Sequence, residues 1–280
     1  MSGTVLLTGA TGFVGRQVLQ RLASQGQRVR LVIRPARQAQ LGASPAIESV
    51  LTTSDLFQED ASWWAQACQG IDTLIHLAWY AEPGKYLESS LNLDCLSGTL
   101  QIARGAARSG VRRWIGCGSC FEYDLNAQLL RPETPLRPLT PYAAAKAATY
   151  LALERWLPAQ GVEFAWCRLF YLYGEGEDAR RLVPYLRSRL SAGLPAELTQ
   201  GTQVRDYLDV REAAHQIVEC ALGSARGGVN ICSGIAITVR QLAEQIADEY
   251  GRRDLLHFGT RPDNVTDPPH VLGLKSLLSA

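Results

Sequence analysis

Three side chains in the middle of the sequence have types and a spacing suited to acid–base chemistry. Tyr142 and Lys146 are four residues apart, so on a helix their side chains leave the same face about one turn apart. A tyrosine with a pKa of about 10 exchanges protons poorly at neutral pH, and an adjacent ammonium lowers that pKa by stabilising the phenolate. Ser119 follows a predicted strand at 112–117 and can hold a substrate oxygen between its hydroxyl and that of Tyr142. We therefore predict Ser119, Tyr142 and Lys146 as catalytic residues, with Tyr142 moving the proton.

A glycine-rich turn near the N-terminus predicts the cofactor that such a tyrosine would serve. The turn at 8–15 follows the apolar run at 4–7 and opens a segment with apolar residues at helical spacing. Glycines three apart allow a sharp turn, a close approach of the backbone to a phosphate, and tight packing of helix on strand. The free amides of the first helical turn then face a pyrophosphate. The predicted dinucleotide contacts here are Gly9, Thr11, Gly12, Phe13, Val14 and Gly15.

This turn, Thr8-Gly9-Ala10-Thr11-Gly12-Phe13-Val14-Gly15, resembles the TGxxGFxG signature of the extended short-chain dehydrogenase/reductases. The resemblance is to the nucleotide-sugar-modifying branch, the NAD(P)-dependent epimerases and dehydratases, and covers about residues 4–261. It implies an α/β fold, a Rossmann-type doubly wound parallel sheet with a smaller C-terminal α/β substrate-binding lobe. The dinucleotide-binding domain is expected at 1–170 plus roughly 205–232. The lobe is expected at roughly 171–204 and 233–280.

The end of the second predicted strand, at 28–33, bears on cofactor choice. An acidic residue at this place accepts ribose hydroxyls in NAD-binding proteins, whereas arginine accommodates a 2′-phosphate. Arg34 and Arg37 therefore favour NADP(H), with NAD(H) as the alternative if they are only solvated loop residues. The resemblance implies further cofactor contacts at Asp55, Leu56, Leu77, Ala78, Trp79, Cys117, Tyr142, Lys146 and Phe170.

Apolar periodicity predicts the elements that position these residues. We expect strands at 47–51, 72–78, 112–117 and 164–170, after those at 4–7 and 28–33. Helices are expected at 62–69, 85–109 and 142–160. Four arginines, Arg180, Arg181, Arg187 and Arg189, are expected on a further helix, mostly as solvated surface.

The substrate side is predicted mainly through the resemblance. The Arg205-Asp206 segment is similar to a family motif whose arginine contacts a nucleotide diphosphate, and Tyr171 stands where the family has an asparagine. The nucleotide-sugar dehydratases carry an Asp-Glu pair after the catalytic Ser or Thr, and Cys120-Phe121 occupies those positions here, so a 4,6-dehydratase is not expected. The predicted substrate contacts are Tyr80, Ser119, Cys120, Tyr171, Arg205 and Arg261.

These residues predict an NADP(H)-dependent oxidoreductase acting on a nucleotide-linked sugar, as a 4-ketoreductase of an NDP-4-keto-6-deoxysugar. The arginine pair favours net reduction, because a reductase consumes cellular NADPH whereas an epimerase recycles a tightly held NAD. Three alternatives stay open at this stage. They are a nucleotide-sugar 4-epimerase, a reductase of a non-sugar ketone, and a non-catalytic nucleotide-sensing regulator.

The composition excludes several other classes of function. The 280 residues carry 28 Lys and Arg against 27 Asp and Glu, a net charge of +1, which predicts no nucleic-acid partner. No apolar run reaches the length of a membrane span and no signal peptide is recognisable, so we expect a cytoplasmic protein without a membrane partner. The spacing of Cys117 and Cys120 is interpreted as chance, and no metal site is predicted. The resemblance also implies a homodimer formed by the helix at 92–107 and the helix after Tyr142.

Overall fold

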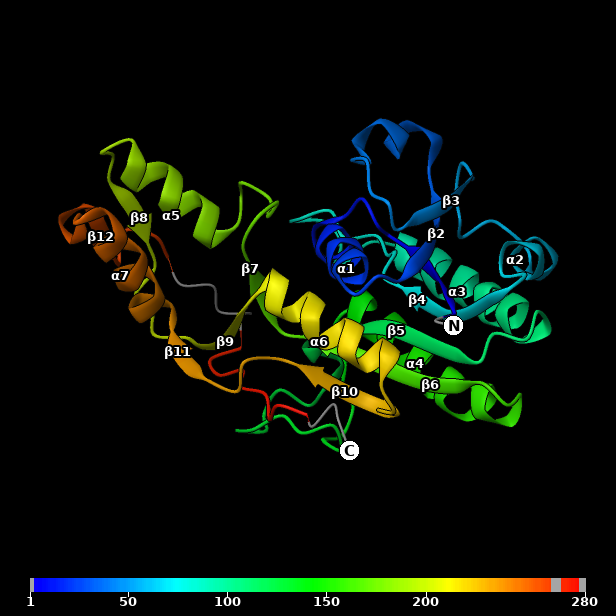
Figure 1. Ribbon diagram of the computed structural model, residues 1–280. Coiled ribbons are helices and arrows are strands. Elements are labelled where there is room, and N and C mark those ends of the chain that lie inside the picture. Colours follow the sequence, from blue (N-terminus) through cyan, green and yellow to red (C-terminus); the bar gives the residue numbers. More distant parts are fainter. Residues whose placement is uncertain (1–2, 263–267, 277–280) are drawn as a thin grey trace.

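A parallel sheet of seven strands, in the order β10-β6-β5-β4-β1-β2-β3, forms the centre of the molecule (Figure 1). The computed structural model describes residues 3–262 and 268–276. The strands are β1 (Thr4–Thr8), β2 (Arg28–Ile33), β3 (Ile47–Thr52), β4 (Ile71–His76), β5 (Arg113–Ser119), β6 (Glu163–Leu169) and β10 (Gly227–Ile231). The predicted doubly wound, Rossmann-type sheet is confirmed.

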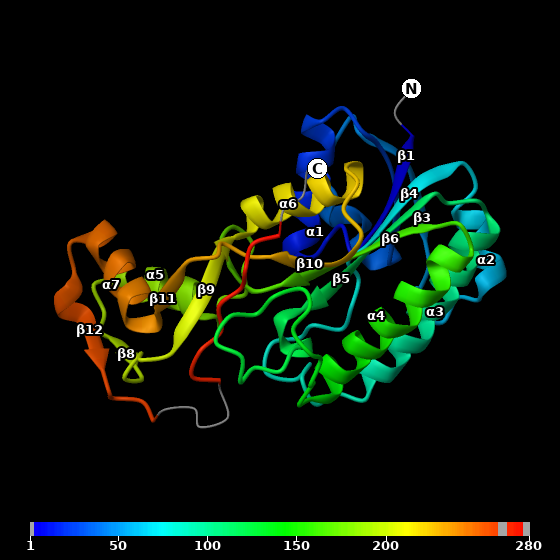
Figure 2. The same cartoon turned by 90° about the horizontal axis from the view of Figure 1, so that it is seen from below.

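Helices cover both faces of this sheet (Figure 2). One face carries α1 (Phe13–Ser24) and α6 (Val210–Leu222), and the other carries α2 (Ala61–Ala67), α3 (Leu91–Arg108) and α4 (Pro141–Ala159). Successive β1 side chains enter different cores: Leu7 packs with Val18 and Ile217, whereas Leu6 packs with Trp114. Burial on both faces explains why the strands consist of nearly continuous apolar runs.

The order of the strands places the ligand region. β1 lies between β4 and β2, so the connections that leave β1 and β4 run in opposite directions across the sheet. Ligands of such sheets bind in the crevice beyond the carboxyl ends of the strands, where this reversal occurs. The turn after β1, residues 77–80 after β4, and Ser119 at the end of β5 all lie at that edge.

A smaller lobe is built from the C-terminal elements. Strands β11 (Ala236–Thr238), β9 (Val204–Asp209) and β7 (Tyr171–Tyr173) form one sheet, and β12 (Leu256–Phe258) pairs with β8 (Ala196–Leu198). The helices α5 (Leu182–Ser191) and α7 (Val239–Tyr250) pack together over an apolar core of their own. Figure 1 shows this lobe projecting from one side of the large sheet.

Three short 3₁₀ turns complete the elements, at Pro35–Gln40, Cys120–Glu122 and Arg253–Leu255. The chain crosses between the two halves more than once. α6 and β10 return to the large sheet, as expected for 205–232, whereas β9 lies in the three-stranded sheet. Gly273 bridges to Leu130, and Val271 packs with Cys120 and Phe170, so 271–273 lies against the large half. The division into two domains stays a prediction.

Two sequence-based assignments of helix are wrong. The helix predicted at 85–109 begins only at Leu91, because residues 81–90 form turns, and the Leu87 carbonyl accepts a hydrogen bond from the Tyr142 amide instead. Arg180 and Arg181 precede α5, where Arg180 pairs with Asp178, whereas Arg187 and Arg189 do lie on α5. The strand predicted at 72–78 ends at His76, and β5 extends two residues past its predicted end to Ser119.

Within the described ranges, 3–262 and 268–276, no helix has both the length and the apolar character that a membrane crossing requires.

Candidate active site at the ends of the central strands

The turn after β1 is so tight that positions 9 and 15 can hold only glycine. Gly9 has a φ of 74°, and a Cβ on Gly15 would lie 2.0 Å from the Gly9 carbonyl oxygen. Gly12 begins α1 without a side-chain cap, and no acidic residue occupies the first turn. This end of α1 therefore presents amides and the positive end of the helix dipole, which suit a pyrophosphate. The partly buried Thr11, Phe13 and Val14 surround it, so the predicted residues fit a dinucleotide.

The residues after β4 lie against this turn. A Cβ on Gly9 would come 2.8 Å from the Ala78 backbone nitrogen and 3.0 Å from the Leu77 carbonyl carbon. The Trp79 indole nitrogen donates to the Asn92 side-chain oxygen at 2.8 Å, which fixes the indole beside the site. The structure therefore brings together the predicted cofactor residues from two separate strand ends.

The remaining predicted cofactor residues occupy different surroundings. Arg34 and Arg37 are exposed at the end of β2, and the Arg37 guanidinium donates to Gln40 at 3.0 Å. Asp55 is exposed and accepts from the Phe57 amide, while Leu56 is buried. Phe170, at the end of β6, is buried in an apolar cluster.

Ser119 ends β5 as a buried residue. Its hydroxyl oxygen accepts a hydrogen bond from the Phe121 amide at 3.2 Å, and its own amide donates to the Glu122 carboxylate at 2.8 Å. These two bonds form a capping box around the short turn at 120–122. The turn thus holds Ser119 by its hydroxyl and by its backbone amide.

Tyr142 and Lys146 lie in the first turns of α4, which is capped by Thr140 and has a proline at its start. The Lys146 ammonium is buried, donates to the Cys117 carbonyl at 2.5 Å, and lies 3.8 Å from the centroid of the Trp79 ring. It lies 6.0 Å from the centroid of the Tyr142 ring. The three predicted catalytic residues therefore share one region with Trp79 and Cys117.

The predicted lowering of the Tyr142 pKa is wrong. Desolvation raises the pKa of Tyr142 well above its ordinary value, and Cys117, Tyr86 and Glu122 raise it further. A hydrogen-bonding contact with Ser119 opposes this rise. Burial lowers the pKa of Lys146. Tyr142 is consequently protonated at neutral pH, which is the form that can donate a proton to a carbonyl oxygen, although the raised pKa makes it a weaker acid than expected.

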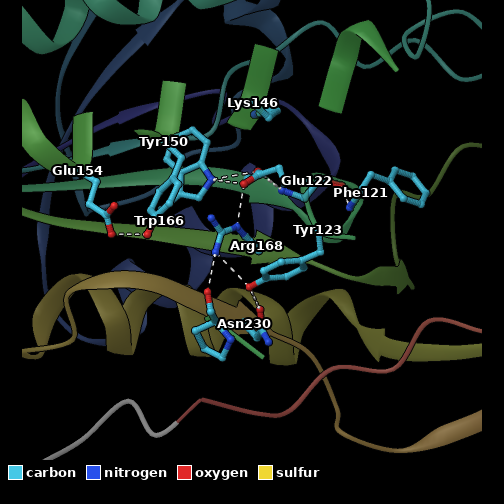
Figure 3. Close-up of polar contacts among 12 residues, drawn as sticks. Phe121, Glu122, Tyr123, Lys146, Tyr150, Glu154, Trp166, Arg168 and Asn230 are labelled. Carbon is cyan, nitrogen blue, oxygen red and sulfur yellow. Dashed lines mark hydrogen bonds and ion pairs between the residues drawn. The ribbon is translucent and has the colours of Figure 1, made fainter. Parts of the chain in front are cut away.

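Three buried residues with polar side-chain groups lie beside the site and were not predicted from the sequence. They are Glu122, Trp166 and Arg168. The Glu122 carboxylate accepts from the Trp166 indole at 3.0 Å and from the Arg168 guanidinium at 2.7 Å, as Figure 3 shows. A sequence signal for them is Arg168 itself, a charged residue within an apolar strand. Burying an unpaired arginine costs free energy, so Arg168 implies a buried acidic partner.

The predicted substrate residues lie on several different elements, and the structure does not bring all of them together. Arg205 on β9 is buried, with its guanidinium 5.1 Å from the Tyr171 ring centroid, and Tyr171 packs edge-on against Phe121. Cys120 is buried in the same apolar cluster as Phe170. The Tyr80 hydroxyl donates to Glu82 at 3.1 Å. Arg261 is exposed in the lobe, 4.9 Å from the Tyr185 ring centroid.

His76, at the end of β4, is held by protein partners on both ring nitrogens. Nδ1 lies 2.8 Å from the Thr8 hydroxyl and Nε2 lies 3.1 Å from the Thr99 hydroxyl. Burial, with a contribution from Lys146, lowers its pKa to about 3. His76 is therefore neutral, and it packs between the cofactor turn and α3.

The seven cysteines, Cys68, Cys95, Cys117, Cys120, Cys167, Cys220 and Cys232, are buried free thiols. Burial raises the pKa of both Cys117 and Cys120. The pair at 117 and 120 is therefore suited to packing and not to thiolate chemistry.

The sequence matches a known protein family. Residues 5–232 match the NAD dependent epimerase/dehydratase family. The chain belongs to this family. The match includes the cofactor turn, Ser119, Tyr142 and Lys146, and ends after β10.

Relatives of known activity are similar over most of the chain. A dTDP-6-deoxy-L-talose 4-dehydrogenase (NAD(+)) of Aggregatibacter actinomycetemcomitans is 24% identical over 97% of this chain and 99% of its own. A dTDP-6-deoxy-L-talose 4-dehydrogenase (NAD(P)(+)) of Kitasatospora kifunensis is 26% identical over 88% of this chain and 79% of its own. A GDP-6-deoxy-D-mannose reductase of Pseudomonas aeruginosa is 26% identical over 89% of this chain and 80% of its own.

Solved structures confirm the fold. A UDP-N-acetylglucosamine 4-epimerase from Methanobrevibacter ruminantium superposes with a TM-score of 0.87 at 23% identity, covering 98% of this chain and 90% of that one. A UDP-glucose 4-epimerase of Thermus thermophilus in complex with NAD gives 0.81 at 21% identity, covering 97% and 90%. These relatives are nucleotide-sugar-modifying, NAD(P)-dependent enzymes.

Proposed function

We propose that this protein is an NADP(H)-dependent 4-ketoreductase of an NDP-4-keto-6-deoxysugar. The observation that carries the proposal is the surroundings of Ser119 and Tyr142. A protonated tyrosine faces a buried serine, and the next two positions hold Cys120 and Phe121 in place of acidic residues. This arrangement supports proton transfer to a carbonyl oxygen without elimination of water. Relatives that oxidise or reduce 6-deoxysugars across nearly the same length support this substrate class.

Bound nicotinamide would supply or accept the hydride. Ser119 would donate a hydrogen bond to the oxygen at C4 of the sugar, and Tyr142 would give that oxygen its proton. Lys146 would hold the cofactor ribose, which requires its ammonium to leave the Cys117 carbonyl or to share its protons with it. Arg205, Arg261, Tyr80, Tyr171 and Cys120 would form the substrate side, with Arg205 on the diphosphate.

The experiment is a search for NADPH oxidation across a panel of nucleotide 4-keto-6-deoxysugars, together with the identity of any nucleotide that copurifies. Oxidation of NADPH by at least one sugar supports the proposal. Copurified NAD, with interconversion of two nucleotide sugars and no added cofactor, would replace it with a 4-epimerase. NADPH oxidation by ketones that lack a diphosphate would indicate a non-sugar reductase.

The preference for NADP(H) rests on Arg34 and Arg37, which are exposed where the adenine ribose is expected. We expect Arg34→Ala to raise the Kd for NADPH about tenfold or more and to leave that for NADH nearly unchanged, because only NADPH loses a charged partner. The measurement is a titration with each cofactor, with Arg28→Ala at the opposite end of β2 as the control. Equal losses for the two cofactors would refute a contact with the 2′-phosphate.

We also propose that the protein is a homodimer, formed by α3 and α4 of each copy. The two helices pack side by side and leave Leu93 and Leu151 exposed. Apolar side chains on adjacent helices suit a helical bundle between copies. A monomeric mass in solution at micromolar concentration would contradict this.

A further inference from the structure

The Glu122 carboxylate is fully buried at the end of β5 and is shared by three donors. Oε1 accepts from the Ser119 amide at 2.8 Å and from the Trp166 indole at 3.0 Å, and Oε2 accepts from the Arg168 Nε at 2.7 Å. Figure 3 shows the carboxylate between the indole and the guanidinium, with Lys146 on the neighbouring helix. Of these donors, the Ser119 amide belongs to a predicted catalytic residue.

The pairing of β5 with β6 creates the space for this carboxylate. Gly116 lies opposite Trp166, and Gly118 lies opposite Arg168. A Cβ on Gly118 would lie 2.3 Å from Glu122 Oε1 and 2.2 Å from the Trp166 indole nitrogen, and one on Gly116 would lie 2.2 Å from the indole ring. The two glycines thus let the indole lie flat against β5 and reach the carboxylate.

The far side of Arg168 is anchored as well. Its Nη1 donates to the Tyr123 hydroxyl at 3.1 Å, and that hydroxyl donates to the Asn230 side-chain oxygen at 2.7 Å. The guanidinium lies 4.2 Å from the Tyr150 ring centroid and 4.6 Å from that of Tyr123. The ion pair and its neighbours therefore connect β5, β6, α4 and β10. These contacts hold the Glu122 carboxylate in one position.

We propose that Glu122 is a positioning residue that fixes Ser119 opposite Tyr142 and supplies a buried negative charge to the active site. This inference rests on the proposed function, because Ser119 matters for turnover only if it holds the substrate oxygen. The carboxylate is not available as an acid or base, since Arg168, Trp166 and the Ser119 amide already use its oxygens. Its role is therefore exerted through its neighbours.

The negative charge has a measurable consequence for titration. Glu122 raises the pKa of Tyr142 and also that of Lys146. Other titratable groups facing these two residues lie on β5, α3, β4 and the 81–90 segment, and they are Cys117, Cys95, His76 and Tyr86. Arg168 on β6 faces Glu122 itself. Removing the Glu122 charge lowers the pKa of Tyr142. The alkaline decline in the rate of ketone reduction should therefore begin at a lower pH.

The test is Glu122→Gln, which keeps the size of the side chain and removes its charge. The amide has one oxygen and one NH2 group, so the hydrogen bond that holds the Ser119 amide either weakens to a neutral one or is lost, according to which group faces Arg168. We expect kcat to fall about 10- to 100-fold with the Kd for NADPH unchanged, as for small displacements of a reacting group. The alkaline limb of the pH profile of kcat should move to lower pH.

The matched control is Glu163→Gln, at the other end of the same two strands. Glu163 pairs with Arg113 across β5 and β6, as Glu122 pairs with Arg168, but far from Ser119. This variant should keep the kcat and the pH profile of the wild type. If Glu122→Gln behaves like Glu163→Gln in both measurements, the inference is overturned.

A second variant separates positioning from folding, because an unpaired Arg168 destabilises the protein. Glu122→Gln with Arg168→Met removes both charges, which often restores stability when an ion pair is buried. We expect the melting temperature to recover, while kcat remains about tenfold low and the alkaline limb remains shifted. Recovery of kcat together with stability would show a merely structural role and refute the proposal.

A readout without turnover distinguishes this inference from the proposed function. The proton resonances of the Trp166 indole N–H and the Ser119 amide should both move upfield in Glu122→Gln, because neither donor then faces a carboxylate. Unmoved resonances would refute the positioning contact, whatever the activity. Moved resonances in a protein that reduces no nucleotide sugar would leave the contact standing and refute the proposed function alone.

Discussion

Two arginines, one in each half of the molecule, are held in different ways. Arg168, in the large half, is fully buried and paired with an equally buried Glu122. Arg253, in the lobe, is an exposed residue whose guanidinium pairs with an exposed Asp248 across the end of α7. Buried polar networks fix geometry, whereas exposed pairs contribute little to stability. Of the two pairs, the buried one is bonded to the Ser119 amide, so it is the pair suited to fixing a reacting group.

Loss of the Tyr142 hydroxyl should have the largest effect, because it removes the proton donor itself. We expect Tyr142→Phe to lower kcat by about 10³-fold or more, while the Kd for NADPH stays near that of the wild type. The corresponding change in the lobe, Tyr250→Phe at the end of α7, should change kcat little. The measurement is steady-state kinetics with a cofactor titration, and retained activity would show that another group donates the proton.

The next effect concerns stability and contrasts the two arginines directly. Arg168→Met leaves the Glu122 carboxylate buried without its cationic partner, which should cost about 3–5 kcal/mol of unfolding free energy. Arg253→Met breaks an exposed pair and should leave the midpoint of denaturant unfolding unchanged. Equal losses in urea titrations would mean that the two halves do not differ in this respect.

A smaller effect is expected from pH, through His76. Its pKa is about 3 in the folded protein, against about 6.5 in the unfolded chain, so the unfolded state binds a proton first as the pH falls. Stability should therefore decrease below pH 6.5, by about 2 kcal/mol between pH 7 and pH 5. Glu177, whose pKa burial raises to about 7, has the opposite dependence.

The difference between wild type and His76→Gln isolates this contribution, because Glu177 is present in both. The curve for His76→Gln should lack the loss of stability between pH 6.5 and 5. His257→Gln, in the lobe, should retain it. Parallel curves for the wild type and His76→Gln would mean that His76 is not kept neutral by the fold.

The fold could be predicted from the sequence because its signals are local. Continuous apolar runs mark strands buried on both faces, and Gly9, Gly12 and Gly15 mark the first turn. The start of α3 could not be predicted in this way. It depends on the bond between the Tyr142 amide and the Leu87 carbonyl, which joins residues far apart in the chain.

The candidate site shows the same limit. Ser119, Tyr142 and Lys146 could be placed in one region from spacing and resemblance, and the structure does bring them together. The direction of the pKa shift of Tyr142 could not be predicted, because it is set mainly by desolvation in the folded protein. The role of Glu122 depends on the register that places Gly118 opposite Arg168. The register between two strands cannot be predicted from the sequence of either strand alone.

The most direct test of the central claim is the transfer of deuterium from NADPH labelled at the transferable position of the nicotinamide. With an NDP-4-keto-6-deoxysugar as substrate, we expect an alcohol that carries one deuterium at C4, formed by the wild type and not by Tyr142→Phe. A product without deuterium, or an epimer formed from a nucleotide sugar with no added cofactor, would contradict it.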